Sequence, residues 1–123
     1  MRLGIIAEKK TQVLLNDVMS RKLPAKTAFR LKTVVKKVRE EIDKYNEVRD
    51  TALQRHGKKN SEGSLEMNSD GNVQFTQEGI QAFIAEMTEL NNLDVEIPTL
   101  SIDEFMGVEF TGEELILLDG LIV

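Results

Sequence analysis

The chain has 123 residues, of which 41% are hydrophobic, 30% charged and 5% aromatic, and it contains no Trp and no Cys. This length suits one domain with a thin core, and the lack of Cys excludes disulfides, thiolate metal sites and cysteine nucleophiles. No apolar run reaches the roughly 20 residues of a membrane-spanning helix, and the N-terminus lacks the apolar region of a signal peptide. We therefore expect a single domain over residues 1–123, with no membrane partner.

Charge is divided unevenly along the chain. Residues 1–59 contain all 16 Lys and Arg and 7 acids, a net charge of +9, whereas residues 60–123 contain 14 acids and no base, a net charge of −14. Such asymmetry is typical of chains with electrostatic contacts. The two halves could pack against each other or against neighbouring copies. Alternatively, the basic part could bind nucleic acid, or the acidic part could occupy a basic site on another protein.

Two helices are predicted in the basic part. Apolar residues recur at helical spacing between residues 7 and 20, which predicts a first amphipathic helix. Pro24 suits the first turn of a second helix, where its missing N–H has no intrahelical partner. This helix is predicted to reach His56, a rod of roughly 50 Å. Its heptad seam, typical of a coiled coil or helical hairpin, has Ala28, Val35, Ile42 and Arg49 at a positions and Leu31, Val38, Tyr45 and Ala52 at d positions.

The stretch 66–78, EMNSDGNVQFTQE, has two interpretations. Apolar and polar residues alternate on both sides of NSDGN, which predicts two short strands joined by a turn. Asn68 and Asp70 would alternatively fall at the third and fifth positions of a calcium loop, with Gly71 at the sixth. That loop needs a bidentate Glu at its twelfth position, and Gln77 stands there. We therefore expect a β-hairpin and no metal site.

The rest of the acidic part is predicted to contain two further helices and an extended arm. Thr76 is a plausible N-cap of a third helix with an apolar stripe, which would lie antiparallel on the long second helix. Pro98 favours an edge strand or an extended arm. Thr111 and Glu114 match a capping box at the start of a short last helix, expected over residues 113–119.

These elements together predict a mainly α fold with a small β element. A long helix packs antiparallel with a shorter one, a β-hairpin is inserted between them, and an extended arm and a short C-terminal helix follow. Residues 1–59 form the basic helical part, and residues 60–123 form the acidic part with the hairpin, helix and arm.

The sequence offers little for catalysis. His56 is the only His, which leaves no His pair for zinc and no His–Ser–Asp arrangement. Carboxylates such as those of Glu113 and Glu114 are adjacent in sequence and therefore point to different sides of a helix, unlike a matched acid and base. No Gly-rich phosphate loop is present. We therefore expect no enzyme, no cofactor and no catalytic or metal-binding residue.

Candidate partner-binding residues fall into an apolar group and a basic group. A small domain with few aromatics should cover the C-terminal apolar stripe only in part. Basic side chains on one flank of the long helix could meet acidic groups or phosphates, although the acidic second half and the scarcity of aromatics disfavour nucleic acid. The candidates are Leu115, Leu118, Leu121 and Ile122 in the stripe, and Arg30, Lys37 and Lys44 on the helix.

Three features occur together in this chain: a leading apolar helix, an LP-x-K…F segment that opens a long helix, and an acidic second half. The residues concerned are Leu23, Pro24, Lys26, Phe29, Tyr45, Arg49, Gly57, the turn at 70–72 and the series Leu115, Leu118 and Leu121. In these features the chain resembles a family of small tailed-bacteriophage proteins. Its Gly- and Pro-interrupted C-terminal end departs from the family pattern.

The resemblance implies a phage accessory or virion component, located in the host cytoplasm during assembly or in the virion, and it supplies no catalytic residue. We predict a non-enzymatic phage structural or assembly-accessory protein that acts through contacts with itself, as a homo-oligomer, or with other virion proteins. The alternative is a small phage regulatory protein that binds a host protein or nucleic acid.

Overall fold

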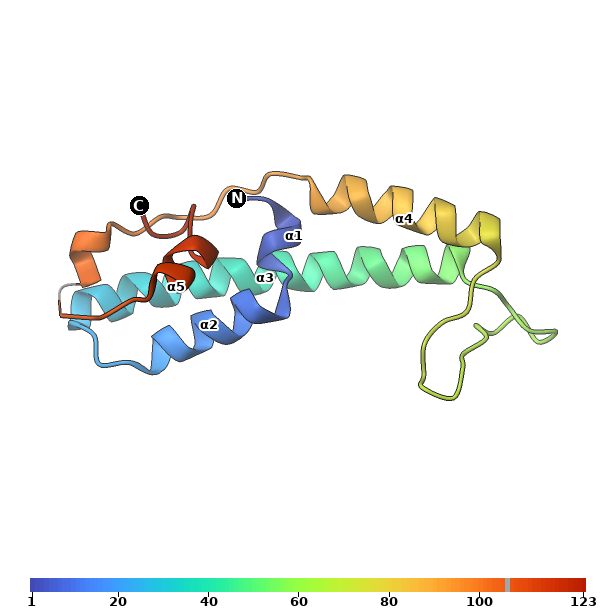
Figure 1. The fold of residues 1–123 in the computed structure, drawn as a ribbon, viewed down its shortest axis with the longest axis horizontal. Coiled ribbons are helices and arrows are strands. Elements are labelled where there is room, and N and C mark those ends of the chain that lie inside the picture. The colour runs from blue at the N-terminus through green and yellow to red at the C-terminus, as the bar shows by residue number, and fades with distance from the viewer. Residues whose placement is uncertain (106) are drawn as a thin grey trace.

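A computed structural model of the chain describes residues 1–105 and 107–123, and most of them are helical (Figure 1). The helices are α1 (Leu3–Ile6), α2 (Lys9–Ser20), α3 (Ala25–His56), α4 (Gln77–Asn91), the 3₁₀ helix η1 (Ile102–Phe105) and α5 (Gly112–Leu117). The predicted mainly α class is confirmed, as is the packing of a long helix with a shorter one. Among the described residues, no helix combines the length and the apolar character needed to cross a membrane.

Helix α3 is the axis of the molecule. Its 32 residues span about 48 Å, and Pro24 stands at its N-cap, one residue before the first turn in which it was expected. Helices α1, α2 and α5 lie along the first half of α3, and α4 lies along the second half (Figure 1). The predicted seam is therefore only partly realised: Val38 and Ala52 are buried, but Ala28 and Arg49 are exposed. The two halves of α3 pack against different elements, so no single heptad stripe is covered along its whole length.

The hydrophobic core lies around the first half of α3. It brings together α1, α2, the arm and the C-terminal segment through Ile6, Leu14, Leu15, Val18, Leu31, Val34, Val35, Val38, Leu100, Phe105, Leu118 and Leu121. The C-terminal segment is held there by backbone pairing with the arm. The Leu100 N–H donates to the Leu121 carbonyl at 2.7 Å, and the Val123 N–H donates to the Leu100 carbonyl at 2.8 Å. The extended arm and the short last helix are thus both present, as predicted.

The second half of the molecule is thinner. The Thr76 side chain caps α4 by accepting a hydrogen bond from the Gly79 N–H at 3.1 Å, which confirms the predicted N-cap. No residue of α4, all of which are described, is buried. The Tyr45 hydroxyl of α3 donates to the Asn91 side-chain oxygen at 2.8 Å and ties the two helices together near the middle of the molecule. This two-helix region therefore has no third layer over it (Figure 1).

The predicted β-hairpin between α3 and α4 is wrong. Within residues 57–76, all of which are described, only two isolated antiparallel bridges form, between Lys59 and Leu65 and between Met67 and Val73. The turn itself is present: the Asn68 side-chain oxygen accepts the N–H groups of residues 70 and 72, and Gly71 has a φ of +80°. An equivalent turn, in which the Asn60 side-chain oxygen accepts two N–H groups and Gly63 has a φ of +81°, precedes it by eight residues.

An eight-residue repeat explains why a ladder does not form. The segments KKNSEGSL, EMNSDGNV and QFTQEGIQ follow one another from residue 58 to residue 81. Their first residues form a closed ring of backbone hydrogen bonds: Lys58 N–H to Gln74, Gln74 N–H to Glu66, and Glu66 N–H to Lys58, at 2.8 to 2.9 Å. Because each segment pairs at this point with both of the others, strand pairs cannot extend. Gly57 lies against this ring, where a Cβ atom would approach Leu65 Cδ2 to 2.5 Å.

Candidate docking site

The candidate site is an open groove of about 660 Å³ between the second half of α3 and α4. Helix α3 contributes Val48 and Ala52, four residues apart, and α4 with the residues after it contributes Leu90 and Leu93, three residues apart. Val48 and Ala52 share one face of α3 at this spacing, whereas Leu93 lies two residues beyond the end of α4. Val48 is 51% exposed and Leu93 is 54% exposed. The groove therefore presents to solvent one apolar side chain from α3 and one from the segment just after α4.

Charged groups surround this apolar surface. Glu47 lies on the α3 side, and Glu86 and Glu89 lie on the α4 side. Arg55 also lines the groove, and its Nη1 lies 2.7 Å from Glu86 Oε1. His56 Nε2 lies 3.3 Å from the same oxygen. The His56 ring and then the Arg55 charge lower the pKa of Glu86. Acids thus dominate the rim, which favours a partner with an apolar side chain flanked by positive charges.

A surface of that kind exists on the first half of α3. Phe29 is 74% exposed, and three exposed lysines, Lys26, Lys32 and Lys36, lie within about two turns of it on the same side of the helix. Among residues 1–105 and 107–123, no carboxylate lies within 4 Å of these three ammonium groups. We refer to Lys26, Phe29, Lys32 and Lys36 as the Phe29 patch.

The basic residues predicted to bind a partner are engaged within the chain. Arg30 pairs with Glu104 of η1. Lys37 and Lys44 lie 3.0 and 2.9 Å from the Glu41 carboxylate, which is buried on α3. Lys44 and then Lys37 lower the pKa of Glu41, and this carboxylate in turn raises the pKa of Lys37. These side chains hold local structure together, and the structure leaves the Phe29 patch as the more available basic surface.

The predicted apolar stripe is divided between core and surface. Leu118 and Leu121 are 1% and 2% exposed, so in this conformation they fill the chain's own core and are not available to a partner. Ile122 is half-buried against the same core, whereas Leu115 is 38% exposed. The burial follows from the pairing of the C-terminal segment with residues 100–102, a long-range contact that local periodicity does not reveal.

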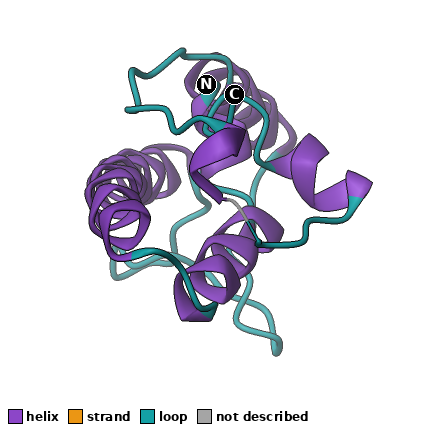
Figure 2. Cartoon of the chain, turned by 90° about the vertical axis from the view of Figure 1, so that its left-hand side faces the viewer, coloured by secondary structure: helices purple, strands orange, loops and turns teal. Residues whose placement is uncertain are grey.

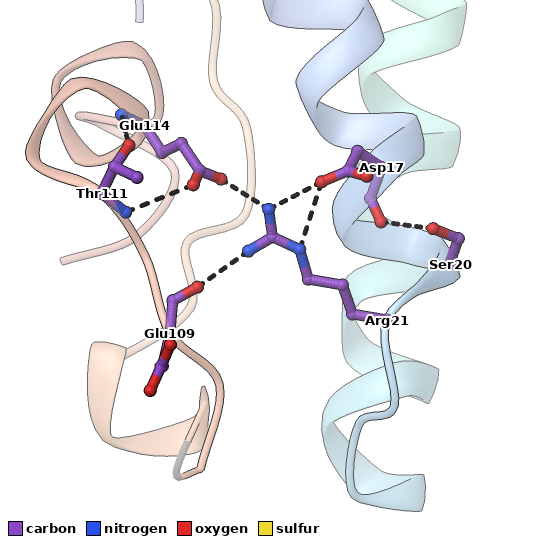
Figure 3. A network of polar contacts seen from close by, with 6 residues as sticks. All are labelled: Asp17, Ser20, Arg21, Glu109, Thr111 and Glu114. Carbon is purple, nitrogen blue, oxygen red and sulfur yellow. Dashed lines mark hydrogen bonds and ion pairs between the residues drawn. The ribbon is translucent and has the colours of Figure 1, made fainter.

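Arg21 forms the densest polar cluster of the described chain, between α2 and α5 (Figure 3). Its Nη2 lies 2.6 Å from both Asp17 Oδ2 and Glu114 Oε2, and its Nη1 donates to the Glu109 carbonyl at 3.0 Å. The hydrogen bonds that Arg21 donates to the Asp17 and Glu114 carboxylates raise the pKa of Arg21. The sequence interpretation missed Arg21, because two of its three partners, Glu109 and Glu114, lie 88 and 93 residues away.

The same cluster supports the predicted start of α5. Glu114 and Thr111 form the expected capping box, and Arg21, followed by the Thr111 N–H, lowers the pKa of Glu114. The ion pairs and hydrogen bonds of the cluster join Arg21, just after α2, to Glu114 of α5, so the cluster fastens α5 to α2 (Figure 3).

No grouping of metal-ligand residues stands out. Within residues 1–105 and 107–123, no set of three or more His, Cys, Asp or Glu side chains is placed to hold a metal ion. In the stretch interpreted above as a turn, the Asn68 side-chain oxygen faces two backbone N–H groups.

Comparisons of the chain with protein-family models, with curated proteins and with solved structures gave no match. Function is therefore inferred from the geometry of the groove and from the features of the sequence.

Proposed function

We propose that this chain is a non-enzymatic phage structural or assembly-accessory protein that acts through protein–protein contacts. The observation that supports this function is the apolar groove between α3 and α4, where Val48 and Leu93 are each more than half exposed. The phage context rests on the resemblance carried by Leu23, Pro24, Lys26 and Phe29 at the start of the long helix.

The packing of α4 supports a docking role. Helix α4 packs against α3 and α1, Phe83 contacts Phe75 of the preceding loop, and none of the residues of α4 is buried. Helices bury an apolar stripe against neighbours in at least two layers, so a helix pair with an open apolar groove is completed when a further element packs into it. A partner that supplies this element would bind here.

The test is the incorporation of the chain into purified phage particles, measured by quantitative mass spectrometry. The groove variant Val48→Asp/Leu93→Asp places charges where a partner would pack, at positions that the folded chain leaves exposed. Ile116→Asp is the matched control, since Ile116 is 76% exposed and lies on α5, outside the groove. We expect the wild type and the control in particles or assembly intermediates, and at least a tenfold loss of the groove variant.

Two results would contradict this function. One is absence of the wild-type chain from particles and intermediates, together with recovery of a host protein or nucleic acid on the tagged chain, which would favour the regulatory alternative. The other is equal incorporation of the groove variant, which would exclude the groove as the contact.

A further inference from the structure

We propose that the occupant of the groove is the Phe29 patch of a second copy, and that two chains pack antiparallel along α3. This inference rests on the proposed function, because it takes the groove as a protein-docking site and names the partner. It is carried by three observations on the described residues: an uncovered helix face, a reversal of charge along that face, and an exposed aromatic residue at one end of it.

The outer face of α3 is uncovered along its length. Lys26, Phe29, Lys36, Asp43 and Glu47 all lie within roughly 60° of one line along the helix, since successive residues are about 100° apart. Each of them is exposed. Figure 2 shows α3 nearly end-on, with the other elements gathered on one side of it and none beyond its outer side.

Charge changes sign halfway along this face, with one exception in the second half, Lys44, whose ammonium pairs with Glu41 of the same chain. Lys26, Lys32 and Lys36 occupy the first half, and Glu40, Asp43 and Glu47 occupy the second half. Among the described residues, none of these six side chains has an oppositely charged group within 4 Å. The first turn of α3 contains no acid, although the helix dipole favours acids there. The stability of α3 alone therefore does not account for the pattern.

Such a face is complementary to its own reversed copy. With a two-fold axis between Lys36 and Glu40, the lysines of one chain face Glu40, Asp43 and Glu47 of the second copy, and the reverse pairing repeats on the other side. A two-fold interface of this kind uses one surface patch twice and closes at two chains. Unpaired surface charges of both signs would thereby be neutralised in one step.

The same register places Phe29 at the groove. Phe29 precedes Glu47 by 18 residues, which is about five turns or roughly 27 Å, so both lie on one line of the helix. In the antiparallel pair, Phe29 of one chain meets Glu47 and Val48 of the second copy, at the α3 edge of the groove. An exposed aromatic ring that enters an apolar groove inside a charged rim is typical of an interface anchor.

The test is charge reversal followed by mixing. Variant A is Lys32→Glu/Lys36→Glu, and variant B is Asp43→Lys/Glu47→Lys. Each alone should be monomeric, because like charges then face each other, whereas an equimolar mixture should form a heterodimer of about twice the 13.9 kDa of one chain. The control Lys9→Glu/Lys10→Glu reverses exposed charges on α2 and should dimerise like the wild type. Mass is measured by analytical ultracentrifugation at low and high salt, with circular dichroism to verify folding.

Phe29→Ser gives an independent measurement, because the side chain is mostly exposed and its loss should leave the fold intact. We expect its dimer dissociation constant to rise at least tenfold, and raised salt to weaken the wild-type dimer.

Several outcomes would overturn the antiparallel pair. These are a wild type that is monomeric at high micromolar concentration, variants A and B that fail to associate on mixing, or a ladder of larger species in place of a closed dimer. The pair would also be overturned if the wild type bound nucleic acid tightly without dimerising and Phe29→Ser abolished this binding. The Phe29 patch would then be a nucleic-acid-binding surface. A monomeric wild type that still enters particles through the groove would remove this inference alone, whereas a dimer that never enters particles would remove the proposed function alone.

Discussion

Leu118→Ala should destabilise the chain far more than Leu115→Ala, although both replace a leucine at the C-terminal end of the predicted stripe. Leu118 is 1% exposed and belongs to the core formed by α1, α2, α3 and the arm, whereas Leu115 is 38% exposed. Truncation of a buried leucine removes its transfer free energy and leaves a cavity, which costs about 2–5 kcal/mol. Truncation of a partly exposed leucine costs about 1 kcal/mol or less.

These costs are large relative to the stability of a small domain, which is about 5–15 kcal/mol. With an unfolding entropy of about 2 cal/mol/K per residue, a loss of about 3.5 kcal/mol lowers the melting temperature of a chain of this length by roughly 14 °C. Leu115→Ala should lower it by no more than about 4 °C.

The assay is thermal and urea unfolding followed by circular dichroism, at two protein concentrations so that any contribution from association appears as a concentration dependence. Equal shifts for the two variants, or a larger shift for Leu115→Ala, would refute the burial of Leu118 in the core. If Leu118→Ala lowered the free energy of unfolding only at the higher protein concentration, Leu118 would lie at an interface between chains.

Two further predictions concern charge and backbone packing. Because Lys44 and Lys37 lower the pKa of Glu41 in the folded chain, its stabilising contribution is complete above the unfolded pKa of about 4.3 and is lost as pH falls through the lower folded value. The difference in unfolding free energy between wild type and Glu41→Gln should therefore shrink from pH 6 to pH 3, and a difference that grows on acidification would contradict the ion pairs. Gly57→Ala should cost about 1–3 kcal/mol in urea unfolding, because its Cβ would approach the Leu53 carbonyl oxygen to 2.6 Å. Gly112→Ala, with no atom within 4 Å of the added Cβ, should be neutral or stabilise α5 by up to about 1 kcal/mol, and equal losses for both would refute this packing.

The features that the sequence predicted correctly are those that depend on neighbouring residues. Pro24 begins the long helix, Thr76 caps α4, and Thr111 with Glu114 forms a capping box, because each arrangement involves atoms within a few residues. The mainly helical class follows from the same local periodicity. The resemblance to phage proteins and the function it implies remain predictions.

The interpretation failed where distant segments decide the outcome. Alternation in residues 65–75 is compatible with strands, but three segments of an eight-residue repeat meet in a ring, and pairing in a ring prevents a ladder. The repeat is visible in the sequence as NSEGS and NSDGN. Its eight-residue period indicates several equivalent turns in succession, which a single hairpin does not have.

The candidate site could not be assembled from the sequence. Val48 and Leu93 lie 45 residues apart, and nothing in either neighbourhood shows that α3 and α4 place them on one groove. Conversely, the sequence predicted that Leu118 and Leu121 are available to a partner. In the structure residues 100–102 pair with the C-terminal segment, and both leucines are buried. Local sequence determined the start and character of each helix, because capping and periodicity are short-range. Only the tertiary structure decided which apolar faces are covered, because burial depends on segments that the chain brings together from far apart.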